Sequence, residues 1–359
     1  MKTIAVNIIV SYWNSPLFVR RLLAPFLEFF VVGSSNKRVK EYIQGISTVC
    51  AERNVVITKK IKKDILKSFI LFGASPLEYF LFNYPNKSLK ERDEFLTDAH
   101  RTQLQKKYIG MSLFKNELIN KYNFYERNKK FFGRECFLLT KDTKFDSFKD
   151  FVKSQGGNVF IKENKGSFGF NASRIKYQDS NDLLLKYNNL QNKGAEWIVE
   201  GVVEQSDLIS VWNQSSVNTI RIPSYLKVDG SNIIFGPFIR TGRYGAVVDN
   251  AGAGGIFAVI DEKTGKIITD GADENFNTYD KHPDSNVTYK GWQVPKWNEL
   301  VSIVSEAHKM MPNHKYIAYD FALTNNGWLM IEGNWGQYVC QQTATQQGCK
   351  NKFMQLIKS

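Results

Sequence analysis

Two patterns of apolar residues divide the chain. In residues 1–115 the apolar positions mostly recur every three or four residues, as on one face of a helix. Ser88 and Glu91 form a capping box, which predicts a helix that carries Leu89 and Leu104. We therefore expect a mostly helical N-terminal region over residues 1–115.

A different pattern begins near residue 140, where short apolar runs are separated by polar turns. These runs predict strands at 158–163, 172–177, 197–203, 217–226, 232–240, 255–261, 316–323 and 328–333. Helical spacing is found at 143–154, 180–191 and 296–310. Because many strands follow one another directly, we expect an α+β fold with antiparallel hairpins.

The first thirty residues are unusually apolar. Residues 3–18 carry no charge, and 22–33 are apolar except for Glu28. Neither stretch reaches the ~18 clean apolar residues of a membrane-spanning helix, and the flanks do not resemble a signal peptide. A buried helix is the preferred interpretation, and a helix lying on a membrane surface is the alternative.

Charge and cysteine content narrow the function classes. The 359 residues carry a formal net charge of +13, which favours anionic partners of any kind. The four cysteines form no Cys-x-x-Cys pair and the four histidines no His-Glu-x-x-His motif, so a zinc enzyme and a disulfide-stapled domain are disfavoured. The cysteine pattern also favours a reducing, cytoplasmic location. The abundant aromatic residues form no RNA-binding motif, so we expect no nucleic-acid partner.

Residues 160–170 combine a strand, Lys162 and a glycine-rich loop. Such a loop lets backbone N–H groups approach phosphate oxygens, and the lysine adds a positive charge. A plain glycine hairpin explains the same residues equally well.

Residues 316–334 predict a hairpin that carries chemistry. If Asn325, Asn326 and Gly327 form a three-residue loop, Asp320 lies opposite Glu332 on the same face, and Asn334 lies one step further along. Facing carboxylates repel each other unless a cation lies between them, and oxygen ligands suit Mg²⁺ or Mn²⁺. A solvent-facing acidic pair is the alternative.

Residues 197–203 form an apolar strand that runs into Glu204, Gln205 and Asp207. Such a strand could line an adenosine slot, with its backbone against the adenine edge and an acid on the ribose hydroxyls. A strand with a polar end is the plain alternative.

These elements resemble, in order and spacing, the ATP-grasp superfamily over residues 118–345. Segments 216–222, 240–243 and 248–255 resemble the sugar-transfer-associated branch, as does 73–79 upstream. The resemblance implies an ATP-grasp fold, with two α+β subdomains that grip ATP: residues 116–203 with the phosphate lid, and residues 204–359 with the metal site. One departure is Trp335-Gly336-Gln337-Tyr338, which stands where the metal motif usually continues into a Pro-Gly turn.

The resemblance also implies roles for single residues. For the nucleotide it indicates two lysines, a phosphate lid, an adenine hinge and a ribose acid: Lys121, Lys162, Gly166, Ser167, Phe168, Gly169, Glu200, Val202, Val203 and Asp207. Lys129 or Lys130 could replace Lys121, and Gln205 could replace Asp207. For the metal it indicates Asp320, Glu332 and Asn334. Arg221 and Arg240, with Asn218, are the expected catalytic residues, and Arg243 is a further candidate.

The function implied is an ATP-dependent, ADP-forming carboxylate–amine ligase that uses Mg²⁺, or Mn²⁺, and proceeds through an acyl phosphate. Its expected substrates are small-molecule or glycan-linked carboxylates and amines of cell-surface polysaccharide or peptide biosynthesis. A kinase acting on a sugar or another small molecule would use the same nucleotide site. A non-catalytic protein that binds nucleotides or polyanions is a third hypothesis, and association with the inner membrane surface is an added alternative for the location.

Overall fold

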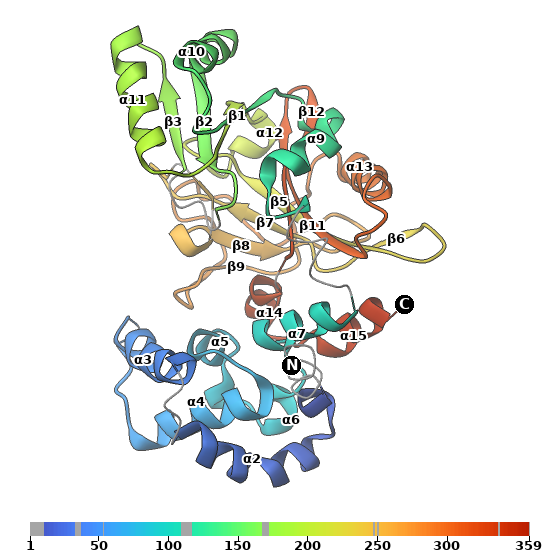
Figure 1. Cartoon of the computed structure of the whole chain (residues 1–359). Helices are drawn as coiled ribbons and strands as arrows, with labels where there is room; N and C mark the ends of the chain where they lie inside the picture. The colour runs from blue at the N-terminus through green and yellow to red at the C-terminus, as the bar shows by residue number, and fades with distance from the viewer. Residues whose placement is uncertain are drawn as a thin grey trace. The chain divides into compact units, whose positions relative to one another are not determined.

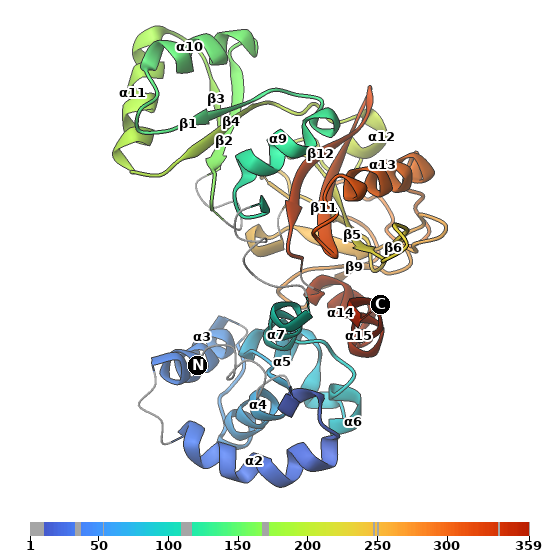
Figure 2. The same cartoon turned by 45° about the vertical axis from the view of Figure 1, so that its right-hand side comes forward.

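The computed structural model describes residues 11–32, 37–52, 54–108, 117–166, 172–246, 248–249, 251–336 and 338–358. They belong to two compact units, drawn as ribbons in Figures 1 and 2. The first unit comprises residues 1–111, 274–277 and 337–359, and the second comprises 112–273 and 278–336.

The first unit is helical. Its helices are α2 (Leu17–Val32), α3 (Lys37–Glu52), α4 (Lys59–Phe72), α5 (Pro76–Leu81), η1 (Tyr84–Asn86), α6 (Leu89–Arg92), α7 (Asp98–Tyr108), α14 (Val339–Thr345) and α15 (Lys350–Lys358). Its core gathers side chains such as Ile65, Leu71, Phe82 and Tyr84. No helix in the described ranges is both long and apolar enough to cross a membrane.

The helix predicted from Ser88 onward ends earlier than expected. The Ser88–Glu91 capping box is present, but α6 stops at Arg92 and α7 starts at Asp98. Tertiary contacts end the helix: the Leu96 N–H donates to Gln342, and the Thr97 hydroxyl donates to the carbonyl oxygen of Phe72. The helical spacing of apolar residues in the sequence therefore continues across the break between α6 and α7, which contacts with distant residues impose.

The second unit begins with α9 (Lys121–Phe132) and contains a small antiparallel sheet. Its strand order is β1-β4-β2-β3, with β1 (Cys136–Leu139), β2 (Asn158–Glu163), β3 (Ser173–Lys176) and β4 (Trp197–Gly201). Helices α10 (Phe145–Ser154) and α11 (Ser180–Asn192) pack together beside it, over a core that includes Phe148, Val159, Leu183 and Trp197.

A larger sheet forms the rest of this unit, in the order β10-β9-β8-β7-β5-β11-β12, with β6 paired to β5. The strands are β5 (Thr219–Leu226), β6 (Asn232–Ile234), β7 (Phe238–Thr241), β8 (Ile256–Val259), β9 (Gly271–Ala272), β10 (Thr278–Tyr279), β11 (Tyr316–Thr324) and β12 (Gly327–Asn334). The short helices α12 (Asp207–Ser210) and η2 (Ala251–Ala253) lie in its connections. Helix α9 packs on β12, and α13 (Trp297–Lys309) packs on β5.

The expected α+β architecture is confirmed. The run predicted as one strand at 232–240 is two strands, β6 and β7, and β1 had not been predicted. β11 lies between β5 and β12 and is buried from Tyr316 to Leu323. This buried strand, which lies next to the edge strand β12, therefore carries Asp320 inside the protein.

Candidate functional site

The β11–β12 hairpin brings Asp320 and Glu332 directly opposite each other. Its turn differs from the prediction, because Thr324 pairs with Gly327 and only Asn325 and Asn326 form the loop. A register shift between Asp320 and Phe321 leaves Ile331 without a paired residue. This one-residue bulge cancels the shorter loop, so the predicted pairing of the two carboxylates is confirmed.

Asp320 is completely buried and is held by two arginines. Arg221, its neighbour on β5, donates from Nε and Nη2 at 2.6 Å each, and Arg240 on β7 donates from Nη2 at 2.9 Å. Burial raises the pKa of Asp320, but the two guanidinium groups outweigh it and leave the pKa below its usual value. The arginines therefore neutralise one of the two facing carboxylates.

Asn334 connects both carboxylates. Its Nδ2 donates to Oδ2 of Asp320 at 3.1 Å and to Oε1 of Glu332 at 3.0 Å. The Asn334 side chain thus reaches both carboxylates. If its amide group were rotated, the Asn334 oxygen would lie beside them in place of the nitrogen. Three oxygen-bearing side chains converge, and hard cations such as Mg²⁺ take such ligands. Asp320, Glu332 and Asn334 therefore fit a magnesium ion.

The same contacts weaken one step of the sequence argument. Repulsion between Asp320 and Glu332 had indicated a cation, but here Arg221, Arg240 and the Asn334 amide relieve that repulsion. Within the described ranges no three His, Cys, Asp or Glu side chains come together as a metal site. The magnesium assignment therefore depends on the type and convergence of the donors.

Lys162, on β2, belongs to a buried charge network. Its Nζ lies 2.8 Å from Oε1 of Glu200, and Arg134 donates to Oε2 of Glu200 from Nη2 at 2.6 Å. Burial raises the pKa of Glu200, but the two cations lower it overall to about 2. Burial lowers the pKa of Lys162, while Glu200 and Glu332 raise it above its ordinary value. Both groups therefore stay charged at neutral pH.

Sequence reasoning missed Arg134, which connects the two sheets of this unit. Besides Glu200 on β4, it donates from Nη1 to the carbonyl oxygen of Met330 on β12, at 2.8 Å. No sequence pattern pointed to Arg134, because it lies in the short connection between α9 and β1. Arg134 therefore holds β4, which carries Glu200, against β12, which carries Glu332.

The structure distinguishes Lys121 from its two alternatives. Asn120 caps α9, and Lys121 is the first residue of the helix, with its Nζ donating to the carbonyl oxygen of Gly166. Lys129 and Lys130 instead pair with Glu135 and Glu306 at the surface, with about half of each lysine side chain exposed. Burial lowers the pKa of Lys121, and the negative charge of Glu332 offsets part of this decrease.

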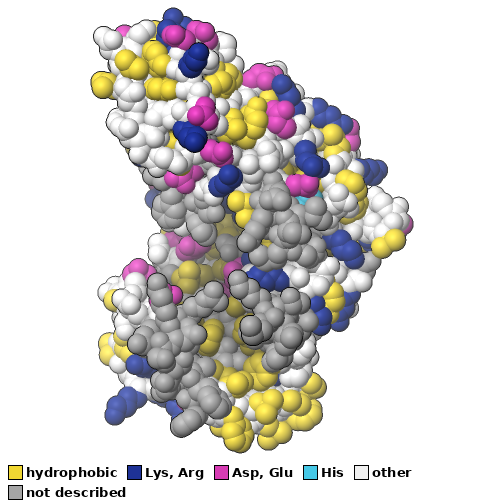
Figure 3. All heavy atoms as spheres, viewed as in Figure 1, with side chains coloured by type: hydrophobic (Ala, Val, Ile, Leu, Met, Phe, Trp, Pro, Cys, Tyr) yellow, Lys and Arg dark blue, Asp and Glu magenta, His cyan; other side chains and the backbone are white. Residues whose placement is uncertain are grey.

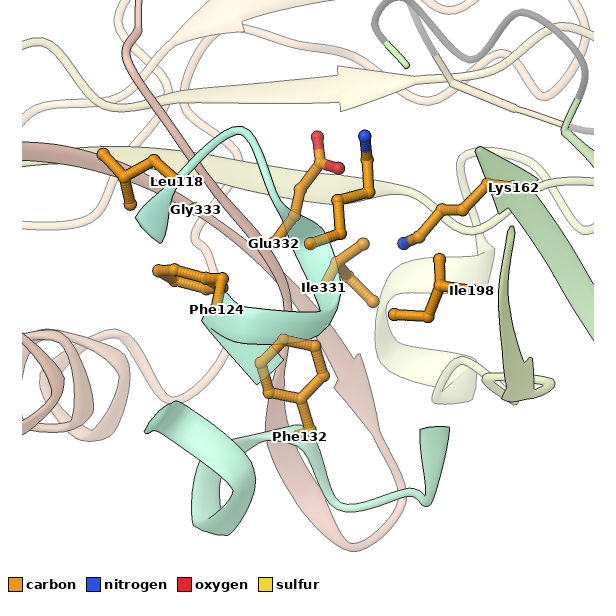
Figure 4. Close-up of a pocket in the computed structure, with 9 residues that line it drawn as sticks. Leu118, Phe124, Phe132, Lys162, Ile198, Ile331, Glu332 and Gly333 are labelled. Atoms are coloured by element: carbon orange, nitrogen blue, oxygen red, sulfur yellow. The ribbon is translucent and has the colours of Figure 1, made fainter. Parts of the chain in front are cut away.

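Lys121, Lys162 and Glu332 line one pocket, and Figure 4 shows Lys162 and Glu332 approaching it from opposite sides. The remaining lining residues are mostly apolar: Leu118, Phe124, Phe132, Ile198, Ile331 and Gly333. Apolar walls with a few converging charges are typical of a small-molecule site.

The beginning of the glycine-rich loop lies beside this pocket. A Cβ on Gly166 would come within 2.8 Å of Glu163, so this close turn requires glycine. Ser167, Phe168 and Gly169 lie outside the described residues.

The hinge residues continue from β4. Glu200 turns toward Lys162 and Arg134, whereas Val202 and Val203 follow the strand and are half-buried. Asp207 is exposed at the start of α12. The Gln205 side chain instead bonds to the backbone of Asn213, Ser216 and Asn218. Of the two ribose candidates, Asp207 is therefore the exposed one.

Asn218 and Arg243 are placed differently from the two arginines on Asp320. Asn218 is completely buried, and its amide donates to Gln205 and to the carbonyl oxygens of Ile209 and Asn213. Arg243 forms a half-exposed pair with Asp284. Among the described contacts, neither residue reaches Asp320. The partners of both residues instead lie in the surrounding fold.

Asp249 is a second residue that sequence reasoning did not assign. It is buried, accepts hydrogen bonds from the Thr219 backbone and hydroxyl, and lies 3.6 Å from Arg240. Thr219 in turn accepts from Arg240. Burial raises the pKa of Asp249 despite the nearby arginine. Asp249 therefore helps to orient Arg240 toward Asp320.

A family model described as sugar-transfer associated ATP-grasp matches residues 138–358. No curated protein sequence matches the chain. Among solved structures, D-alanyl-alanine synthetase A from Vibrio cholerae is similar at 13% identity, with 67% of this chain and 64% of that chain covered and a TM-score of 0.41. D-alanine–D-alanine ligase from Bacillus anthracis complexed with ATP is similar at 14% identity, with 67% and 65% covered and a TM-score of 0.39.

The ATP-grasp ligase PsnB, complexed with a phosphomimetic variant of its minimal precursor, Mg and ADP, is similar at 9% identity. The match covers 72% of this chain and 65% of that chain, with a TM-score of 0.42. The chain thus spans less than two thirds of the length of these three structures. Similarity at this level carries no conclusion about activity.

Proposed function

The chain belongs to the sugar-transfer-associated ATP-grasp family, and from this premise we propose that it is an ATP-dependent, ADP-forming carboxylate–amine ligase. The observation that carries the proposal is the convergence of Lys121, Lys162 and Glu332 on one pocket, with Asp320 and Asn334 beside Glu332. Two half-buried cations facing acidic oxygen ligands suit a polyphosphate with its magnesium ion.

In this proposal Lys121 and Lys162 bind the ATP phosphates, and the loop from Gly166 to Gly169 covers them. Val202 and Val203 present backbone groups to the adenine, and Asp207 takes the ribose hydroxyls. The buried Arg134–Glu200 pair holds Lys162 in place, because Glu200 contacts both cations. Glu200 is thus a positioning residue and does not itself need to touch adenine.

Asp320, Glu332 and Asn334 would hold Mg²⁺, or Mn²⁺, which when bound neutralises phosphate charge. Arg221 and Arg240 lie next to these ligands and provide the positive charge that a carboxylate substrate and a transferred phosphoryl group require. Asn218 supports this region from inside the fold.

The proposed chemistry has two steps. A carboxylate oxygen attacks the γ-phosphorus of ATP, ADP leaves, and an acyl phosphate forms. An amine then attacks the acyl carbon, inorganic phosphate leaves, the nitrogen loses a proton, and an amide results. We propose small-molecule or glycan-linked carboxylates and amines of cell-surface polysaccharide or peptide biosynthesis as substrates. We place the reaction in the cytoplasm, where ATP is supplied.

Hydroxylamine trapping tests this proposal. The protein, Mg-ATP and candidate carboxylates such as uronic acids or amino acids are mixed without an amine, and hydroxylamine is added. An acyl phosphate yields a hydroxamate together with ADP. Arg221→Ala should lower the hydroxamate yield, whereas Arg174→Ala, on the exposed face of β3, should leave it unchanged.

Two results would contradict the ligase assignment. A stable phosphorylated product without hydroxamate would make the protein a kinase, with the same nucleotide site. ATP binding without any ADP release, across carboxylates and amines offered in pairs, would make it a non-catalytic nucleotide-binding protein.

A further inference from the structure

Helix α2 exposes an apolar face to solvent. Five large apolar side chains share this face, with exposed fractions from 37% to 69%: Phe18, Leu22, Leu23, Phe26 and Leu27. Figure 3 shows hydrophobic side chains gathered at the end of the helical unit where Figure 1 draws α2. Single exposed apolar residues are ordinary, but a contiguous face on one helix indicates a binding surface.

The opposite face of α2 holds the helix in a defined orientation. Arg20 is 2% exposed, donates to the carbonyl oxygen of Leu71, and forms an ion pair with Asp93 at 2.5 Å. Ala24 is buried in the core of the helical unit, and Leu17 packs against that core. The exposed apolar face is therefore a fixed feature of the unit.

Basic residues lie on the helix that packs against α2. Helix α4 packs on α2, and the two helices lie side by side in Figures 1 and 2. Five exposed lysines lie on α4: Lys59, Lys60, Lys62, Lys63 and Lys67. Asp64, the acidic residue among them, is already paired with Arg92 at 2.8 Å. Val56 and Ile57, just before α4, add exposed apolar side chains.

We propose that the α2 face, together with the α4 lysines, binds the surface of an anionic lipid bilayer. The apolar side chains would enter the boundary between headgroups and acyl chains, and the lysines would contact the anionic headgroups. A helix of 16 residues is too short to span the bilayer, so α2 would lie in its plane. This proposal is independent of the proposed ligase activity.

Charge distinguishes a bilayer from a second copy of the chain as the occupant. A two-fold dimer through α2 would place the same surface on both subunits, so the partner's α4 would add further lysines and no counter-charge for them. An anionic bilayer instead attracts them. The apolar face and the lysine row therefore both favour a negatively charged surface as the partner.

Vesicle flotation of the full chain tests the proposal. Vesicles of phosphatidylcholine alone are compared with equimolar phosphatidylcholine and phosphatidylglycerol, at low and high salt. The double variant Leu22→Ser/Phe26→Ser removes apolar contact, and its control is Leu185→Ser, a similarly exposed leucine on α11. A second variant changes four α4 lysines to glutamine: Lys59, Lys60, Lys62 and Lys63. Its control changes four exposed lysines of the other unit to glutamine: Lys263, Lys266, Lys281 and Lys290.

We expect the wild type to float with the anionic vesicles and to be released by salt. Each α2 or α4 variant should bind at least about tenfold more weakly, with an unchanged thermal unfolding midpoint, and the controls should bind as the wild type does. The proposal is wrong if the wild type does not float with anionic vesicles at low salt, or if the controls lose as much binding as the variants. Concentration-dependent dimerisation that Leu22→Ser/Phe26→Ser abolishes, without vesicle binding, would assign the face to a second copy.

Discussion

Replacing Arg134 by methionine should destabilise the sheet-bearing unit more than the same substitution at an exposed arginine. The substitution keeps much of the side-chain volume but removes the cation that contacts Glu200 at 2.6 Å and the Met330 carbonyl at 2.8 Å. Among the described residues, Lys162 would then remain as the charged partner of Glu200. No water reaches the buried carboxylate to replace the lost cation, so Lys162 alone would have to offset the cost of burying it.

The burial of the pair sets the magnitude. Removing one partner of a buried ion pair typically lowers stability by about 3–5 kcal/mol, and the Arg134 and Glu200 side chains are only 7% and 5% exposed. The lowered pKa of Glu200 agrees in direction, because Arg134 and Lys162 together outweigh the effect of burial. We therefore expect Arg134→Met to lower the free energy of unfolding by about 3 kcal/mol.

Urea-induced unfolding followed by tryptophan fluorescence measures this change, because Trp197 is buried on β4 beside the network. The matched control is Arg243→Met, which breaks the partly exposed pair with Asp284, with side chains 39% and 24% exposed. That variant should change the unfolding free energy by about 1 kcal/mol or less. If Arg134→Met is no more destabilising than Arg243→Met, the buried network does not hold the two sheets as argued.

Three further predictions concern the site. Lys162→Ala should weaken ATP binding about tenfold to a hundredfold, because charge-assisted contacts contribute about 1.5–3 kcal/mol; calorimetry should show no such loss for the exposed Lys263→Ala. Glu332→Gln should abolish Mg²⁺-dependent ADP formation with the fold intact, whereas the exposed Glu306→Gln should stay active. Full activity of Glu332→Gln would remove Glu332 from the metal site. The pKa of Glu200 is lower in the folded protein than the ordinary 4.5, so its contribution to stability is complete above pH 4.5 and is lost as the pH falls toward 2. Acid unfolding of the Glu200→Gln variant should lack this part of the pH dependence. An acid-unfolding profile identical to that of the wild type would contradict the lowered pKa.

Local patterns in the sequence were sufficient for most helices and strands and for the pairing of the two hairpin carboxylates. The predicted helix at 296–310 is α13, and the predicted strands at 316–323 and 328–333 are β11 and β12. These elements could be predicted because their apolar period extends over several residues and reflects one buried face. Asp320 and Glu332 were found opposite each other even though the turn was one residue shorter, because a bulge at Ile331 compensated for it.

Only the tertiary structure decided which charges meet. The sequence left Lys121, Lys129 and Lys130 open, and the capped start of α9 turns Lys121 toward Gly166 while the other two reach surface acids. It gave no sign that Arg134 would reach Glu200, 66 residues away. It also could not show that arginines from β5 and β7 would meet on Asp320, because the pairing of distant strands, and with it the balance of buried charges, depends on packing that no local period encodes.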